Sequence, residues 1–593
     1  MTIKPKYKFI LGYAFGHRQP SMLVRLSVDP DCNIDAGVAR VSRLSMLHPD
    51  TKTGASLDSI PKRIAELIGF FALRLQRDAG IAVFASPYSC LLSHHAGEKR
   101  SPSELTLTYP CPEPDACTAA IDWVVAAIFS SLEDEPLTER LSALRAKLKK
   151  FALVGLNQMH FLETAHQEGI PARALLKPLA YVFGEGSASI WLSSTITDQT
   201  PSLGVSIATD KLQCSAVMRA HGMPVPDHIA VASADQAVQA ARRLGFPVVV
   251  KPSDLEQGMG VSAGLTTEAV VAEAYSYACR FSKKILVEKH VHGQDFRLTA
   301  MHGKVIKVMQ RIPGGVTGDG QSSVQALIEQ AQTEPAARRR FLKEGKHRLC
   351  LDEEALSVLT ELNMTPDSIL TAGRFLALRR KSNISSGGTQ TVIAIETVHP
   401  NNLELACRAT EVLGLDIAGV DLLVPDIGIS WKTSGGAICE INAAPQIGAS
   451  DTPRIFSEML AALLPTGGRI PTYLQICIDL PPETESRMAH HWAAESNSNG
   501  ISMRGEVVVN GTAQGTAPTD GLVAGKRVLI DRRVRSAVVS MTERDLLTLG
   551  MPSFSWTSVR LLRRGKSGGA TDVPPDLRAV LAPHKCVVVS VVC

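Results

Sequence analysis

Short runs of apolar and β-branched residues alternate with amphipathic stretches along most of the chain. Strand patterns cover Phe246 to Val250, Lys284 to Glu288 and Val305 to Met309, and helical patterns cover Ile60 to Arg77 and Ala119 to Leu132. Strands that alternate with helices are typical of α/β and α+β domains. The pattern therefore predicts a multidomain α/β and α+β fold.

Fully apolar strand patterns return near the C-terminal end. They cover Gln475 to Ile478, Arg527 to Ile530, Ser536 to Val539 and Cys586 to Val592. Strands that are apolar on both faces favour a parallel sheet covered on both sides. In the N-terminal region, Ile81 to Ala85 is predicted as one more short strand.

The chain length bears on the number of domains. A single core rarely grows beyond about 250 to 300 residues, and 593 residues therefore predict several domains. Residues 1–165 hold no catalytic cluster and are predicted as a structural or docking domain. Residues 166–465 hold the candidate chemistry, and 466–593 form a third, α/β domain.

Composition excludes several classes of protein. The 62 Lys+Arg against 58 Asp+Glu give a formal charge of +4, too weak for a nucleic-acid-binding footprint. No Cys or His cluster has zinc spacing, and no stretch approaches 18 apolar residues. We therefore expect a cytoplasmic protein without a nucleic-acid or membrane partner.

Two segments have the composition of a nucleotide site. Lys251 ends an apolar strand and precedes a loop with Gly258 and Gly260, where backbone amides can approach phosphate oxygens. The strand ending at Glu288 leads into a second segment, in which a carboxylate and a guanidinium follow at Asp295 and at position 297. Taken alone, the first is more often an ordinary turn and the second a solvated strand end.

A third segment predicts a metal site. Asp421 lies in one apolar strand pattern, and Glu440 and Asn442 lie in another, where a period of two places both on one face. Carboxylate and amide oxygens suit Mg²⁺. Because an unpaired buried glutamate is costly, Glu440 in an apolar strand requires a cation or another partner.

The order of these residues, with Lys211 in Ala208 to Lys211, resembles that of the ATP-grasp superfamily. Residues from about 183 to 464 resemble more narrowly the ATP-grasp domain of the cyanophycin synthetase family. The motifs that carry this resemblance are Thr195 to Asp198, Val316 to Gly320, Asn383 to Thr389, Val398 to Pro400 and Glu440 to Pro445.

The resemblance implies an ATP-dependent carboxylate-amine ligase with ATP and Mg²⁺ as cofactors. It implies these roles: phosphate binding by Lys211, Lys251, Gly258 and Gly260; adenine binding by Glu288, Lys289 and Val291; ribose binding by Asp295; binding of two Mg²⁺ by Asp421, Glu440 and Asn442; oxyanion stabilisation by Arg297 or Arg311; and substrate binding by Asn383, Ser385 and Gly387. A structural salt bridge remains an equal alternative for Arg311.

Full-length members of the family carry a C-terminal Mur-ligase-like domain with a Walker-type phosphate loop. Here the strand from Leu474 to Ile478 is followed by Asp479 to Glu485, which holds three acids and neither glycine nor lysine. Such a segment would repel a triphosphate. We interpret 466–593 as a truncated, degenerate Mur-ligase-like domain and expect one ATP site per chain.

This organisation resembles the short second type of cyanophycin synthetase, which joins β-aspartyl-arginine dipeptides. The leading hypothesis is polymerisation of such dipeptides, with a carboxylate-bearing peptide or polymer and an amine-bearing dipeptide as substrates. A homo-oligomer, dimer or tetramer, is expected by family analogy. Ser206, Gln257, Met259 and Gly314 to Gly315 depart from the family pattern, which leaves the substrate open. A ligase that makes one small peptide and a non-catalytic nucleotide-binding scaffold are the alternatives.

Overall fold

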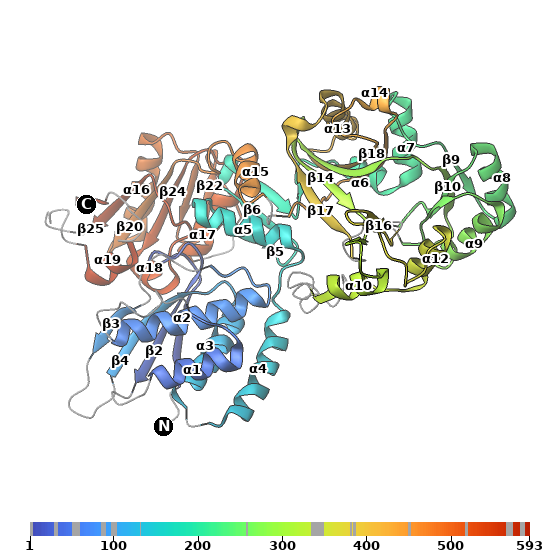
Figure 1. The fold of residues 1–593 in the computed structure, drawn as a ribbon. Coiled ribbons are helices and arrows are strands. Elements are labelled where there is room, and N and C mark those ends of the chain that lie inside the picture. Colours follow the sequence, from blue (N-terminus) through green and yellow to red (C-terminus); the bar gives the residue numbers. More distant parts are fainter. Residues whose placement is uncertain are drawn as a thin grey trace. The chain divides into compact units, whose positions relative to one another are not determined.

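The structure is a computed structural model of the chain. It describes residues 4–28, 34–49, 60–84, 91–95, 103–130, 132–255, 259–333, 349–379, 382, 387–448, 452–515, 520–564, 573–581 and 588–592. Residue contacts divide the chain into two compact units (Figure 1). Unit 1 comprises Met1–Ser194 and Gly448–Cys593, and unit 2 comprises Thr195–Ile447.

The N-terminal part of unit 1 is an antiparallel sheet with helices packed on it. Its strands, in the order β1-β2-β4-β3, are β1 (Lys6–Ile10), β2 (Ser21–Val28), β4 (Ser103–Pro110) and β3 (Leu91–His95), and its helices are α1 (Ile34–Ser45), α2 (Ile60–Asp78), α3 (Pro114–Phe129) and α4 (Asp134–Lys149). Both predicted helices are confirmed. The strand predicted from Ile81 is wrong: Ile81 N donates to Gln76 O (3.0 Å), and Phe84 N donates to the Gln19 side chain, so residues 81–84 follow α2 without regular secondary structure. Ala85 lies outside the described residues.

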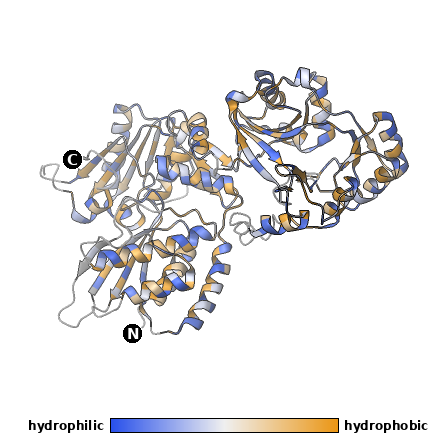
Figure 2. Ribbon diagram, in the orientation of Figure 1, coloured by the Kyte–Doolittle hydropathy of each residue, from blue (hydrophilic) through white to orange (hydrophobic). Residues whose placement is uncertain are grey.

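The C-terminal part of unit 1 is a seven-stranded sheet in the order β23-β22-β21-β24-β20-β25-β26. The elements are β20 (Thr472–Ile478), α16 (Pro482–Glu495), β21 (Gly500–Met503), β22 (Glu506–Val509), β23 (Thr512–Ala513), α17 (Gly521–Ile530), β24 (Ala537–Thr542), α18 (Glu543–Leu549), β25 (Ser558–Arg563), α19 (Pro575–Leu581) and β26 (Val588–Val592). From β21 through β24, β20 and β25 to β26 the strands run parallel, as predicted. Figure 2 shows the hydrophobic colour of these central strands.

One predicted strand of this region is wrong, because Arg527 to Ile530 is the end of helix α17. Asp520 caps this helix by accepting a hydrogen bond from Val523 N (2.8 Å). Its buried residues Leu522, Val528 and Leu529 follow helical spacing. A four-residue apolar window is too short to distinguish the two periods.

The two ends of the chain share a core in unit 1. Tyr13 and Met551 exchange two backbone hydrogen bonds of 2.8 Å, and Ile10 and Tyr13 pack among the apolar residues of the seven-stranded sheet. The remaining elements of unit 1 are α5 (Leu156–Glu168), β5 (Ala172–Leu176), β6 (Ala180–Phe183), η1 (Gly186–Ala188), β7 (Ile190–Ser193) and α15 (Ile455–Leu463). The division into domains at 1–165, 166–465 and 466–593 stays a prediction.

The described part of unit 2 contains two larger antiparallel sheets, each covered by helices on one face, and the two-stranded sheet β15-β16. The first, in the order β11-β10-β12-β9, consists of β9 (His228–Val231), β10 (Val248–Pro252), β11 (Ser262–Leu265) and β12 (Ile285–Lys289), with α8 (Ala234–Leu244) and α9 (Glu268–Ala278). The second, in the order β17-β14-β13-β18-β19, consists of β13 (Gln294–Met301), β14 (Lys304–Ile312), β17 (Thr389–Ile393), β18 (Ile417–Val424) and β19 (Ala437–Asn442), with α6 (Ser202–Thr209), α7 (Lys211–Ala220), α13 (Pro400–Val412) and α14 (Trp431–Ser434). Smaller elements are β8 (Ile196–Thr197), β15 (Gly315–Thr317), α10 (Val324–Thr333), α12 (Glu353–Glu361), β16 (Phe375–Ala377) and η3 (Ile395–Thr397).

These parallel and antiparallel sheets confirm the predicted α/β and α+β fold class. The three strands predicted in the central region correspond to β10, β12 and β14. In the part of the chain that the structure describes, no helix combines the length and the apolar character needed to cross a membrane.

Candidate active site

The predicted metal ligands lie side by side on two neighbouring strands. Asp421 of β18 pairs in register with Glu440 of β19, and Gly419 pairs with Asn442. Glu440 and Asn442 are two residues apart on β19 and therefore face the same side of the sheet, as the sequence predicts. The opposite face, which includes Val420, packs into the helix-covered core.

A bulge lies next to this pair. The register between β18 and β19 shifts between Asp421 and Leu422, which pair with Glu440 and Ile438, and Cys439 is therefore the extra residue. Burial raises the pKa of the Cys439 thiol, and the neighbouring Glu288 adds to this effect. The place of Cys439 could not be predicted from the sequence, because a bulge leaves no signal in the alternation of apolar and polar residues.

Two arginines surround Asp421. Arg297 lies opposite it on β13 and forms a two-pronged pair, which includes an Nη2 to Oδ2 bond of 2.9 Å. Arg311 Nη2 lies 2.8 Å from Asp421 Oδ2 and 2.6 Å from Asp295 Oδ1. Burial alone would raise the pKa of Asp421, but Arg297 and Arg311 outweigh it and hold this pKa below its usual value. For Asp295 burial prevails, and its pKa is raised despite Arg311.

Nearby cations compensate the negative charge of Glu440 less than that of Asp421. Its closest described cation is Lys211, whose Nζ lies 3.8 Å from Glu440 Oε1. Burial raises the pKa of Glu440, and the lysine offsets only part of that effect. Lys211 is the first residue of α7, a helix that Asp210 caps by accepting from two backbone amides. Lys211 Nζ also donates to Leu255 O (2.5 Å).

A second cation-carboxylate pair lies on the other sheet. Lys251 of β10 and Glu288 of β12 are diagonal neighbours, since Val249 is paired directly with Glu288. The Lys251 Nζ lies 2.8 Å from Glu288 Oε1, and each side chain is about 10% exposed. Burial alone would lower the pKa of Lys251, but Glu288 outweighs it and raises this pKa. The two side chains assigned to phosphate and adenine thus pair with each other.

The segment after Glu288 is held by backbone hydrogen bonds. Lys289 N donates to Asp227 O (2.8 Å), and His290 N donates to Pro247 O (3.1 Å). The Lys289 ammonium donates to Gly245 O (2.7 Å) near the end of α8. Val291 comes directly after His290 in the chain. The Lys289 side chain therefore has a structural role here, and its carbonyl and the groups of Val291 are the ones that could meet an adenine edge.

Some predicted residues lie outside the described part of the chain, namely Gly258, Asn383 and Ser385. Gly260 has a left-handed φ of 68°, and a Cβ there would lie 3.0 Å from Pro252 Cγ. Gly387 has a φ of 91°, and a Cβ there would lie 3.0 Å from Leu349 Cβ. Conformation and close packing therefore both favour glycine at these two positions.

Lys307 lies on the same face of the five-stranded sheet as Arg297, Arg311 and Asp421, which we call the charged face, and it was not predicted as a site residue. It pairs with Thr299 of β13, which in turn pairs with Gly419, and its Nζ donates to Ile447 O (2.8 Å). The sequence did contain a signal for it. Lys307 precedes Arg311 by four residues on one strand, and the alternation of side chains along a strand places both on the same face.

The predicted ligand set fits a divalent cation by its chemistry. Asp421 and Glu440 supply hard carboxylate oxygens, and Asn442, which lies on the same strand face as Glu440, supplies an amide oxygen. Burial raises the pKa of Glu440, and the positive charges of Lys211, Arg297 and Lys251 offset only part of that effect. In the described part of the chain no group of three or more His, Cys, Asp or Glu could hold a metal, and the predicted set has two carboxylates.

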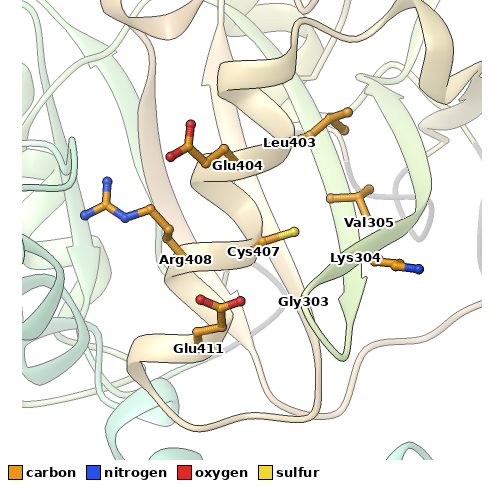
Figure 3. Close-up of a pocket in the computed structure, with 8 residues that line it drawn as sticks. All are labelled: Gly303, Lys304, Val305, Leu403, Glu404, Cys407, Arg408 and Glu411. Atoms are coloured by element: carbon orange, nitrogen blue, oxygen red, sulfur yellow. The ribbon is translucent and has the colours of Figure 1, made fainter.

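A surface hollow of about 550 Å³ lies elsewhere in unit 2 (Figure 3). Leu403, Glu404, Cys407, Arg408 and Glu411 of α13 line it, together with the turn between β13 and β14. That turn is at the opposite end of the two strands from Asp295 and Arg311. The hollow contains none of the predicted site residues and is distinct from the charged face.

In unit 1, the segment after β20 differs from a phosphate loop. Glu485, in the first turn of α16, is buried, accepts from Ser540 Oγ (2.9 Å), and lies 3.0 Å from Arg504 Nε. A helix N-terminus attracts anions, and here a carboxylate of the chain itself is held in the first turn.

Comparison with known proteins shows what part of unit 2 is similar to. Residues 217–317 match the family described as D-ala D-ala ligase C-terminus, and this range contains Lys251, Glu288, Asp295 and Arg311. A crystal structure of a bifunctional glutathione synthetase from Pasteurella multocida is 24% identical, with a TM-score of 0.39, over 58% of this chain and 49% of its own. The family match agrees with the resemblance of this region to ATP-grasp ligases.

The curated relatives include cyanophycin synthetases. The one from Trichormus variabilis is 29% identical over 418 residues, which are 68% of this chain and 45% of the relative. The one from Geminocystis herdmanii is 31% identical over 314 residues, which are 52% of this chain and 36% of the relative. The chain thus spans less than half the length of these relatives. The resemblance to ATP-grasp ligases of the cyanophycin synthetase family is confirmed.

Proposed function

We propose that the chain is an ATP-dependent carboxylate-amine ligase that polymerises β-aspartyl dipeptides, β-Asp-Arg or a close analogue, into a cyanophycin-like polymer. The observation that carries this proposal is the charged face of the five-stranded sheet. It gathers Asp295, Arg297, Arg311, Asp421 and Glu440 on the four adjacent strands β14, β13, β18 and β19. The relatives named cyanophycin synthetase support the same function.

The chemistry requires that two anions approach each other. A carboxylate oxygen of the growing chain attacks the γ-phosphorus of ATP, the bond from that phosphorus to the ADP oxygen breaks, and an acyl phosphate forms. Lys211 and Lys251 would bind phosphate oxygens and lower the repulsion. The Lys251 ammonium lies 2.7 Å from Glu288 Oε2. To bind phosphate it must therefore either contact the phosphate and Glu288 together or move away from Glu288.

Asp421, Glu440 and Asn442 would hold Mg²⁺, which when bound offsets the charge of the phosphate oxygens. Arg297, aligned by its two-pronged pair with Asp421, would keep a fixed orientation toward the reacting carboxyl group. The amine of the incoming dipeptide then attacks the acyl carbon, phosphate leaves, and the nitrogen loses a proton. Arg311 is the nearby cation that would stabilise the oxyanion of this step.

The test is phosphate release with β-Asp-Arg, β-Asp-Lys and related dipeptides, followed by mass spectrometry of the product. A ladder of masses supports polymerisation, and the Glu440→Gln variant should yield none of it. One condensation product contradicts polymerisation and leaves a small-peptide ligase. Silence with every dipeptide, despite ATP binding, rejects polymerisation of β-aspartyl dipeptides, and ATP binding without any turnover is the result that a nucleotide-binding scaffold predicts.

A further inference from the structure

Unit 1 contains a cavity of about 430 Å³ that the proposed ligase reaction does not use. Its volume lies within the range of roughly 300 to 1,000 Å³ that is usual for small-molecule sites. Its walls come from the N-terminal segment around Tyr13, from the β5–β6 hairpin and from α17, all within unit 1. The lining contains none of the residues of the candidate active site.

Most of the cavity wall is apolar. Ile81, Phe84, Leu162, Val182 and Ile530 are among its lining residues. Ile81 and Phe84 are nearly inaccessible to solvent, as are the apolar lining residues of β6. A pocket of this kind favours a ligand with an apolar body, because burial of apolar surface drives binding.

The charged groups of the cavity are predominantly cations. Arg173, Lys177 and Lys526 line it, and Glu113 is the acid in the lining. Lys177 Nζ lies 2.7 Å from Glu113 Oε1, so these two charges cancel. Burial lowers the pKa of Lys526, and the positive charges of Arg173 and Lys177 lower it further. Lys526 thus experiences a positive field that nearby acids do not fully neutralise.

Two hydrogen-bond donor atoms of Arg173 have no acceptor among the described residues. Its Nη2 donates to Glu185 Oε1 (3.1 Å), while Nε and Nη1 are buried and have no acceptor among the residues that the structure describes. Buried donors in folded proteins are nearly always paired. Lys526 Nζ donates to Leu11 O (3.0 Å), and an ammonium has three donors in total. Arg173 and Lys177 each have an acid within ion-pair distance, Glu185 and Glu113, whereas the structure gives Lys526 no such partner among the described residues and only the more distant Asp520 acts on it.

We propose that this cavity binds an amphipathic small molecule with a single carboxylate, held by Arg173 and Lys526, whose apolar body lies against Phe84 and Leu162. The planar guanidinium matches the two oxygens of a carboxylate. One negative charge balances the excess positive charge, and a compact inorganic anion would leave the apolar walls without a partner.

The first experiment uses the full-length protein with octanoate and 3-phenylpropionate as probes. Their neutral counterparts, octanol and 3-phenylpropanamide, and the compact anions acetate and phosphate complete the panel. Thermal shift identifies binding, and titration calorimetry measures it. We expect the two amphipathic carboxylates to bind at least about tenfold more tightly than every other compound. Equal binding of the neutral counterparts, or no binding by either carboxylate, would overturn the proposal.

The second experiment locates the site. Lys526→Gln keeps a donor for Leu11 O but removes the charge, and it should weaken carboxylate binding about tenfold or more. Ala174→Trp, at an exposed lining position, should block the cavity without changing a charge. Lys147→Gln, an exposed residue of α4, is the matched control and should bind normally. Glu440→Gln in unit 2 should also bind normally, and loss of binding there would overturn the proposal.

Discussion

Lys251 and Glu288 form a buried ion pair between two strands of unit 2, with Nζ 2.8 Å from Oε1 and 2.7 Å from Oε2. One face of these strands packs into the helix-covered core, and the pair lies on the other. Removing one partner of such a pair leaves a buried charge without compensation, which costs about 3–5 kcal/mol. The pair thus has a structural role in addition to the proposed phosphate contact.

Lys251→Met should therefore lower the free energy of unfolding by about 3–5 kcal/mol and abolish ATP binding. The double variant Lys251→Met/Glu288→Leu should recover most of the stability but none of the ATP binding. Urea denaturation and nucleotide titration measure the two effects separately. The exposed pair Arg242–Glu268 is the matched control, and Arg242→Gln should hardly change stability. Recovery of ATP binding in the double variant would contradict the phosphate role of Lys251.

Glu440→Gln should abolish turnover and at the same time stabilise the protein in the absence of metal. Burial raises the pKa of Glu440 in the folded state, so the folded chain holds the proton more tightly than the unfolded chain. The carboxylate therefore destabilises the fold as the pH rises above about 4.3, the ordinary value for glutamate, and glutamine removes this effect. Thermal unfolding at pH 7 measures it.

Binding of Mg²⁺ and ATP should make the wild-type protein more stable than the Glu440→Gln variant, the reverse of the order without metal. A ligand at 100 times its Kd stabilises a protein by about 2.7 kcal/mol. The wild-type protein should gain this stability and the Glu440→Gln variant should not. Equal stabilisation of the two proteins would show that Glu440 is not a metal ligand.

The alternation of apolar and polar residues is a local signal, and it correctly placed Glu440 and Asn442 on one face of a strand. This local signal could not predict the ion-pair partners of Asp421. Arg297 reaches Asp421 across 124 positions of sequence, through the register between β13 and β18. The bulge at Cys439 and the helix that ends at Ile530 also depend on packing with distant segments, which no short window contains.

The stabilising effect of Asp421 should depend on pH with a predictable sign. Its pKa is held below the ordinary value of 3.8 in the folded state by Arg297 and Arg311, despite burial. The ionised form is therefore favoured by folding, and its full contribution is present above about pH 4 and is lost as the pH falls through the folded-state value. Asp421→Asn should cost about 3–5 kcal/mol at pH 7.

Urea denaturation from pH 3 to pH 8 checks this dependence. The difference in unfolding free energy between the wild-type protein and Asp421→Asn should be constant from pH 5 to pH 8 and should shrink below pH 4. A difference that changes between pH 6 and pH 8 would require a different titrating group.

The chain should bind one ATP. In unit 1 the first turn of α16 holds the buried carboxylate of Glu485, between Ser540 and Arg504, after the strand where a Walker-type loop would begin. A triphosphate there would meet Asp479, Glu483 and Glu485. Equilibrium binding should therefore give one ATP per chain for the wild-type protein and none for the Lys251→Met/Glu288→Leu variant. A second ATP, or residual binding in that variant that Glu485→Gln alters, would show that the C-terminal sheet still binds nucleotide.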